Sequence, residues 1–423
     1  MATLNLRVYS KLNRIRVERI LLFSLLFLYS IRFLNKNCTW LLLFCAVSFF
    51  LTFHQTRNAR ITAPVELVSL VCFGAVYYIF DIVNYHISMN LTSAVTLCFG
   101  APLMYLSAKR LLIYSDKAEN TYMILVWVMA IGMMLWPFMS YLKYGVVTDY
   151  SPGMDTRLIA DFWTGATDQV TNHNGYCVPV LVLSFCSVVL APSITEKIFT
   201  SVPFCLVLLL SLVTVSRTNL ILTLVLALSL VVVSVVVRRG YAPMMEIQTV
   251  RRICICVLLI VLLFPLFAYF SSQLLSLLPI DAFRERTASR ALSVRNDSRW
   301  VFWETVIREI PSHPFGGIRS VEAAHNLLLD TARVAGIFPM ICMLLFLSST
   351  VFGSMELVSR RYLSTRIRAT NFLLILILMM SFMIEPTLSA KPFVFIGFCF
   401  ICGLQRGMLE NENCEIGPYN ALE

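Results

Sequence analysis

Long apolar runs alternate with short polar segments along most of the chain. An apolar run of about 17 to 25 residues is long enough for an α-helix to cross the hydrocarbon core of a bilayer. Runs of roughly this kind lie at residues 17–34, 38–53, 64–83, 90–107, 121–142, 175–191, 198–216, 218–237, 253–272, 333–353, 370–386 and 390–405. The pattern predicts an all-α, polytopic membrane protein with about twelve transmembrane helices.

Composition supports the same class. Apolar residues make up 58% of the 423 residues and charged residues only 14%, which is typical of an integral membrane protein. We predict one integral membrane domain over residues 1–423. Basic residues precede the first apolar run, but no small-residue cleavage site follows it, so we predict a retained first helix rather than a signal peptide.

Lysine and arginine gather in alternate polar segments. The clusters are the N-terminus, Arg57/Arg60, Lys109/Arg110/Lys117, Arg238/Arg239/Arg251/Arg252 and Arg360/Arg361/Arg366/Arg368. Because short basic loops stay in the cytoplasm, both termini are predicted to be cytoplasmic. The net charge of +10 then reflects topology, and it gives no reason to expect a nucleic-acid partner.

The 13 cysteines are scattered through the apolar runs, where cysteine behaves as a small apolar residue. Cys399 and Cys402 form a C-x-x-C inside an apolar run without partner cysteines. We expect neither a disulfide framework nor a metal or redox role for them.

Two polar segments are predicted to be long external loops, at 143–174 and 273–332. The second is the longest polar segment of the chain, and a loop of that size in a compact domain usually has a function. Within it, DSRWVFWETVIREI predicts a helix that lies in the membrane interface, with Trp300 and Trp303 as anchors and Asp297 or Ser298 as N-cap. PSHPFGG then predicts a turn.

Cations on the external side are the first candidate site residues. The second loop contains arginine but no lysine, and guanidinium binds phosphate in a planar geometry that suits a diphosphate. The same loop also contains acidic residues, so we expect most of these arginines to pair with acids or solvent and two or three to contact a ligand. Arg299, which begins the predicted interfacial helix, is a candidate for the diphosphate, and Arg319 is a candidate for the substrate cavity. Arg217 lies in a very short turn between two apolar runs, so it either faces a protein cavity or reaches lipid headgroups.

His325 is the candidate base. Imidazole accepts a proton from a hydroxyl at neutral pH, and this histidine ends the second loop. Asn326 follows it directly, and Asp330 and Arg333 are spaced for an i, i+3 pair that stabilises the helix start. His173 and Asn174, in NHNGY, are candidates for the cavity wall. The external loops contain no acidic cluster of metal-ligand type, so we expect no metal and no cofactor.

Three segments, in order along the chain, resemble the O-antigen ligase and Wzy-type O-antigen polymerase superfamily of bacterial inner membranes. They are SRTNLI around Arg217, DSRWVFWETVIREIPSHPFGG from Asp297, and HNLLLDTARVAGIFP from His325. NHNGY resembles a further family element. The likeness covers residues 155–345, with Ile221 and Pro339 departing from the family pattern.

The resemblance implies an enzyme that transfers a glycan from undecaprenyl diphosphate to a sugar hydroxyl on the periplasmic side. It implies that Arg217 and Arg299 bind the diphosphate, that His325 acts near the acceptor hydroxyl, and that Asn326, His173, Asn174 and Arg319 lie around the substrate. We predict metal-independent transfer with inversion, a role in lipopolysaccharide biosynthesis, and an acceptor glycolipid and a chain-length regulator as partners.

Three functions stay open at this point. A polymerase uses a second lipid-linked repeat unit as acceptor, whereas a ligase uses lipid A-core. The short spacing between Gly317 and His325 favours the polymerase. A flippase for the same lipid-linked sugars is the alternative from another class, but it would place charged groups at mid-membrane.

Overall fold

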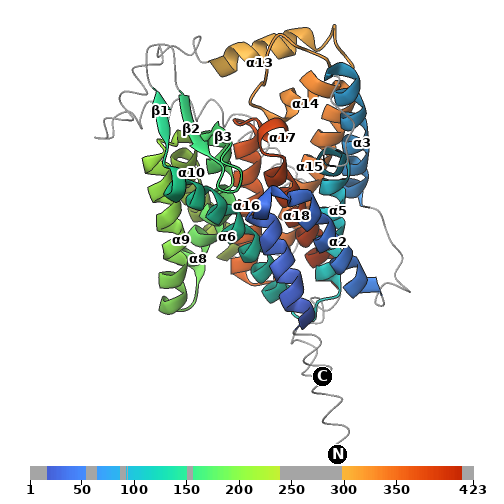
Figure 1. Cartoon of the computed structure of the whole chain (residues 1–423). Helices are drawn as coiled ribbons and strands as arrows, with labels where there is room; N and C mark the ends of the chain where they lie inside the picture. Colours follow the sequence, from blue (N-terminus) through green and yellow to red (C-terminus); the bar gives the residue numbers. More distant parts are fainter. Residues whose placement is uncertain are drawn as a thin grey trace, which may run out of the picture.

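The computed structural model describes residues 17–53, 64–85, 92, 94–149, 156–238 and 298–411. Most of these residues are helical, and the helices pack as one bundle (Figure 1). The predicted span at 253–272 and the first part of the loop 273–332 lie outside the described residues.

The helices follow the predicted apolar runs closely. The first covers residues 17–30. The others are η1 (Phe33–Asn35), α2 (Asn37–Phe53), α3 (Val65–Tyr85), η2 (Ala94–Phe99), α5 (Gly100–Ile113), α6 (Ala118–Tyr144), α7 (Val170–Gly175), α8 (Val178–Leu190), α9 (Ile194–Val213), α10 (Arg217–Arg238), α13 (Ser298–Glu309), α14 (Leu327–Ala335), α15 (Ile337–Ser359), α16 (Thr365–Phe382), α17 (Thr387–Ala390) and α18 (Pro392–Leu409).

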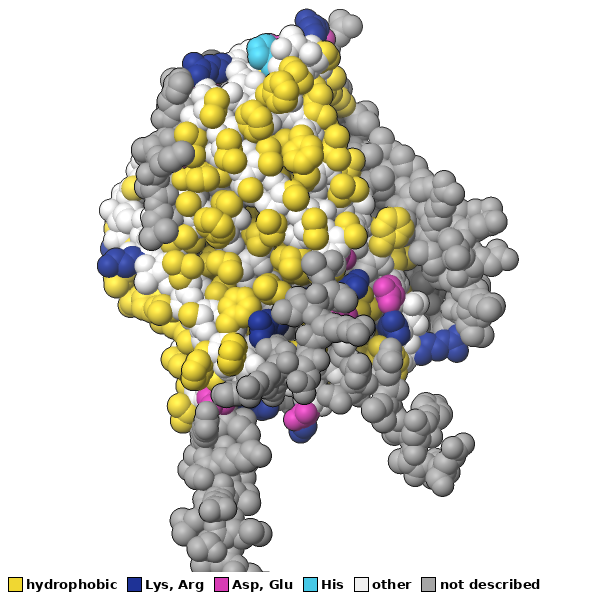
Figure 2. Space-filling model, turned by 90° about the vertical axis from the view of Figure 1, so that its right-hand side faces the viewer, with side chains coloured by type: hydrophobic (Ala, Val, Ile, Leu, Met, Phe, Trp, Pro, Cys, Tyr) yellow, Lys and Arg dark blue, Asp and Glu magenta, His cyan; other side chains and the backbone are white. Residues whose placement is uncertain are grey.

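Six of the described helices are long and apolar enough to cross a membrane: α3, α6, α9, α15, α16 and α18. Three shorter apolar helical stretches lie in α2, α8 and the first part of α10. Hydrophobic side chains are spread over the coloured part of the face shown in Figure 2, and α3 and α15 carry exposed apolar residues. The chain is therefore an all-α, multi-pass membrane protein. The predicted total of twelve spans remains a prediction.

Helix α18 forms the centre of the bundle. Its apolar window is 83% buried, against 17% for α9. A Cβ at Gly403 would lie 2.1 Å from the Tyr105 carbonyl oxygen, and one at Gly407 would lie 2.5 Å from that of Lys109. These glycines therefore allow α18 to approach the backbone of α5, as small residues commonly do between membrane helices.

The segment predicted to be the first external loop contains a small sheet that the sequence analysis did not predict. Strands β1 (Val147–Asp149), β2 (Thr156–Ala160) and β3 (Thr167–Gln169) pair antiparallel in that order. They are too short to show a clear alternation of apolar and polar residues. The sheet lies at the same end of the bundle as α13, α14 and α17 (Figure 1), which we call the outer end.

The helix predicted to begin at residue 333 is divided in the structure. Gly336, with φ of +90°, separates α14 from α15. A Cβ at this position would lie 2.2 Å from the Pro314 carbonyl oxygen, so the turn after α13 packs directly onto the break. Only glycine combines this φ with such a close approach.

The predicted helix in DSRWVFWETVIREI is present as α13, and Trp303 makes contacts that the sequence analysis did not predict. Its indole N–H donates to the Ala324 carbonyl at 2.6 Å, and its ring packs against a small cluster that contains Val306 and Ile318. Trp303 therefore packs α13 onto the segment before His325, and its predicted role as a membrane-interface anchor remains a prediction.

Candidate functional site

The site is centred on a buried carboxylate at the outer end of the bundle. Glu385 lies between α16 and α17 and is only 5% exposed. It accepts a hydrogen bond from the Thr218 hydroxyl at 3.0 Å, and its oxygens lie 3.3 Å from Lys391 Nζ and 3.9 Å from Arg299 Nη2. The first turns of α10 and α13 therefore meet the α16–α18 link at this side chain.

His325 belongs to the same group. Its neighbour Asn326 caps α14 by accepting two backbone N–H groups of the first turn, and the Asn326 amide donates to the Met383 carbonyl at 3.3 Å. Asn326 thus connects the His325 segment to the link that contains Glu385. His325 itself has a φ of 53°, a left-handed conformation that non-glycine residues adopt rarely and often at functional positions.

We call Thr218, Arg299, His325, Glu385 and Lys391 the Glu385 cluster. It contains three basic side chains and one carboxylate. Burial raises the pKa of the Glu385 carboxyl, but Lys391, Arg299 and His325 together outweigh burial and lower that pKa below its ordinary value. Burial also lowers the pKa of Lys391, against the opposing effect of Glu385. Glu385 is therefore ionised at neutral pH and surrounded by cations.

Arg217 is the residue before Thr218 and begins α10. The turn that leads into it is rigidly held, because the buried Arg157 guanidinium donates to the carbonyls of Thr214 at 2.7 Å and Val215 at 3.0 Å. Val215 has a φ of 51°. The turn therefore holds the start of α10, with Arg217, directly beside the Glu385 cluster.

His173 and Asn174 of α7 are both buried. The His173 ring stacks on Trp136 with centroids 4.3 Å apart, and burial lowers its pKa to about 4. Asn174 donates to the Thr214 hydroxyl at 2.9 Å. In the structure these two side chains pack against α6 and the α9–α10 turn, so they support the turn that positions Arg217.

The glycine of the same motif supports the lysine of the cluster. A Cβ at Gly175 would lie 2.6 Å from Lys391 Cδ and 2.8 Å from its Nζ. A larger residue at 175 would therefore displace the lysine from Glu385. This gives a physical reason for the glycine of NHNGY, which is the last residue of α7.

Arg319 lies at a different part of the outer end. It donates to the Asn84 carbonyl and lies 5.8 Å from the centre of the Tyr85 ring, both at the end of α3. The predicted Asp330–Arg333 pair is confirmed at 3.5 Å. Asp330 also accepts a hydrogen bond from the Ala324 N–H at 2.6 Å. This bond holds the irregular segment that precedes His325.

The structure thus places Arg299 3.9 Å from Glu385 and His325 near enough to lower the pKa of that carboxyl, and Arg217 precedes Thr218, which donates to the same carboxylate. The sequence analysis missed Glu385 and Lys391, because it assigned 370–386 and 390–405 to apolar helices. One signal was present: ionisable residues at the ends of apolar runs are costly unless they have partners or a function. Within the described ranges no three His, Cys, Asp or Glu side chains form a metal-ligand group.

Compared with models of protein families and with curated proteins, the chain matches none.

Proposed function

We propose that this protein is an O-antigen polymerase of the bacterial inner membrane, with about twelve spans, cytoplasmic termini and a periplasmic active site. It transfers a glycan from undecaprenyl diphosphate to the sugar of a second lipid-linked repeat unit. One observation carries the proposal: Arg299 and Thr218, at the start of α10, contact the buried Glu385 at the outer end, and His325 lies near enough to lower the pKa of that carboxyl. The likeness of the Arg217, Arg299 and His325 segments to the O-antigen ligase and polymerase superfamily supports the same reaction.

The reaction needs a base and a site for a departing anion. The acceptor hydroxyl oxygen forms a bond to the anomeric carbon while the bond from that carbon to the phosphate oxygen breaks, which inverts the anomeric centre. His325 takes the hydroxyl proton, and undecaprenyl diphosphate leaves with the bond electrons. Arg217 and Arg299 stabilise the negative charge that develops on the diphosphate.

Glu385 has a positioning role in this proposal. Its ionised carboxylate holds Arg299 and Lys391 at the outer end, and its charge stabilises the imidazolium that forms when His325 accepts a proton. The cluster contains more basic side chains than acidic ones. It therefore favours a ligand that brings at least one further negative charge.

The choice of polymerase rests on the segment between Gly317 and His325. In the structure the segment between Gly317 and His325 contains no helix and no strand. We infer that the acceptor side is compact and suits one repeat unit. A deletion strain with single-repeat lipopolysaccharide would support polymerase activity. Bare core with accumulated lipid-linked polymer would indicate a ligase.

The central test is His325→Ala in the full chain, with His313→Ala as the matched control. His313 is on the exposed turn after α13 and contacts Ser312 and the Glu309 carbonyl. We expect polymer formation by the His325 variant to fall by about a hundredfold to ten-thousandfold, with lipid-linked intermediates on the periplasmic face and normal activity in the control. Intermediates held on the cytoplasmic face would instead indicate a flippase.

A further inference from the structure

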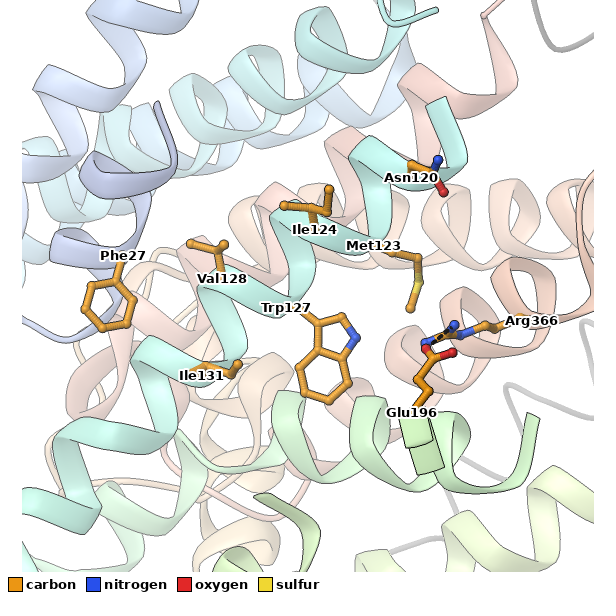
Figure 3. A pocket seen from close by; sticks show the side chains of 9 residues that line it. All are labelled: Phe27, Asn120, Met123, Ile124, Trp127, Val128, Ile131, Glu196 and Arg366. Carbon is orange, nitrogen blue, oxygen red and sulfur yellow. Dashed lines mark ion pairs between the residues drawn. The ribbon is translucent and has the colours of Figure 1, made fainter. Parts of the chain in front are cut away.

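A groove of about 550 Å³ opens on the side of the bundle between α6, α9 and the first helix. Figure 3 shows its lining: apolar side chains of α6 from Met123 to Ile131, with Phe27 near one end. The opposite end carries Asn120 and the ion pair between Glu196 of α9 and Arg366 of α16. The groove thus has a long apolar part and one polar end.

Its length corresponds to one leaflet. Residues 120–131 of α6 rise by about 16 Å at 1.5 Å per residue, which is roughly half of the ~30 Å hydrocarbon core. Ile124, in the middle of this lining, remains 44% exposed. A single acyl chain has the length and the chemistry to cover these side chains.

The polar end carries both signs of charge. Arg366 Nη1 lies 2.5 Å from Glu196 Oε1, and Nη2 donates to the Ser187 hydroxyl at 3.0 Å. The arginine and glutamate side chains stay 23% and 32% exposed. A guanidinium has five N–H donors and a carboxylate accepts about four hydrogen bonds, so each partner can bind a further group of opposite charge.

We propose that this groove is a binding site for one zwitterionic phospholipid of the phosphoethanolamine type. One acyl chain lies along α6, the phosphate contacts Arg366, and the ammonium contacts Glu196. A headgroup with a phosphate and no ammonium would bring its negative charge to Glu196 without compensation, which disfavours it. The inference depends on the membrane class of the chain and not on the proposed glycosyl transfer.

The test uses the purified full chain, delipidated in detergent and titrated with phosphatidylethanolamine or phosphatidylglycerol of identical acyl chains, with bound lipid counted by native mass spectrometry. We expect one phosphatidylethanolamine per chain, bound about fivefold more tightly than phosphatidylglycerol. Glu196→Gln removes the negative charge that pairs with the ammonium and should abolish this preference. Ile124→Trp fills the groove and should abolish binding.

The matched control is Ile79→Trp, a similarly exposed position on α3, which should bind as the wild type does. Thermal unfolding of each variant shows whether it is folded, and Val128→Trp provides a second groove-filling variant. Equal binding of the two lipids by the wild type would overturn the proposal. So would retention of lipid by both folded groove-filling variants, or a wild type that forms dimers through this face and carries no lipid.

Discussion

The two ends of the bundle use charged side chains in different ways. At the outer end, Glu385 is buried with Lys391 and meets Arg299 and His325. At the other end, ion pairs join the starts and ends of helices, and in the pair of Arg366 with Glu196 both side chains are partly exposed. Exposed pairs contribute little to stability, whereas buried charges are costly unless they have a function.

The charged residues predicted to set the orientation of the helices are different from those of the candidate site. Lys109 pairs with Glu410 at 2.8 Å, and Arg406 pairs with the same glutamate at 2.6 Å. Lys109 belongs to a basic segment predicted to stay in the cytoplasm, and segments of this kind set the orientation of membrane helices. In the Glu385 cluster, the basic groups exceed the acid in a buried place, as expected of a site that receives an anion.

Removing the central carboxylate should have the largest effect. We expect Glu385→Gln to lower the free energy of unfolding by about 3–5 kcal/mol, because it leaves Lys391 buried without its acidic partner. Glu385→Gln combined with Lys391→Met should recover most of that stability and none of the activity. Denaturation and polymer formation are measured on both. Recovery of activity in the double variant would show that the pair serves packing alone.

Arg299→Lys tests the planar geometry of the guanidinium. Loss of its hydrogen bonds to a charged ligand should reduce polymer formation by about ten- to a hundredfold, with little change in unfolding. Arg308→Lys is the matched control, since Arg308 lies on the same helix and its side chain is 76% exposed. Equal activities of the two variants would exclude a role for Arg299 in binding the diphosphate.

Because the pKa of the Glu385 carboxyl is shifted, we expect the free energy of unfolding to depend on pH. Its pKa is lower in the folded protein than in the unfolded chain, so its stabilising contribution is fully present above the unfolded value of about 4.3. That contribution is lost as the pH falls through the folded pKa. The stability of the wild type should therefore decrease more than that of Glu385→Gln below about pH 4.3. Parallel curves would contradict the ionised state.

Breaking an exposed pair should have the smallest effect. Arg360 lies 2.7 Å from Glu356, four residues before it on α15, and both side chains are partly exposed. We expect Arg360→Gln to change the free energy of unfolding by about 0.3–0.5 kcal/mol. Activity should not change. If Arg360→Gln lowered the free energy of unfolding as much as Glu385→Gln, the charged side chains at the two ends of the bundle would not differ in their contribution to stability.

Local patterns predicted individual elements well. The helix that begins at Ser298 followed from its cap and spacing, and the Asp330–Arg333 pair followed from the i, i+3 rule. The sheet in residues 147–169 was missed because its strands are short. The break at Gly336 was missed because its cause, the close approach of Pro314, involves a residue from another part of the chain.

The sequence by itself determined the membrane class and most helix positions, because hydropathy and helical period are properties of neighbouring residues. It also singled out Arg299 and His325 by their chemistry. Only the tertiary structure decided that these side chains meet at Glu385. Thr218 and Glu385 are 167 residues apart, and their contact depends on how α10 and α16 pack, which no local pattern encodes.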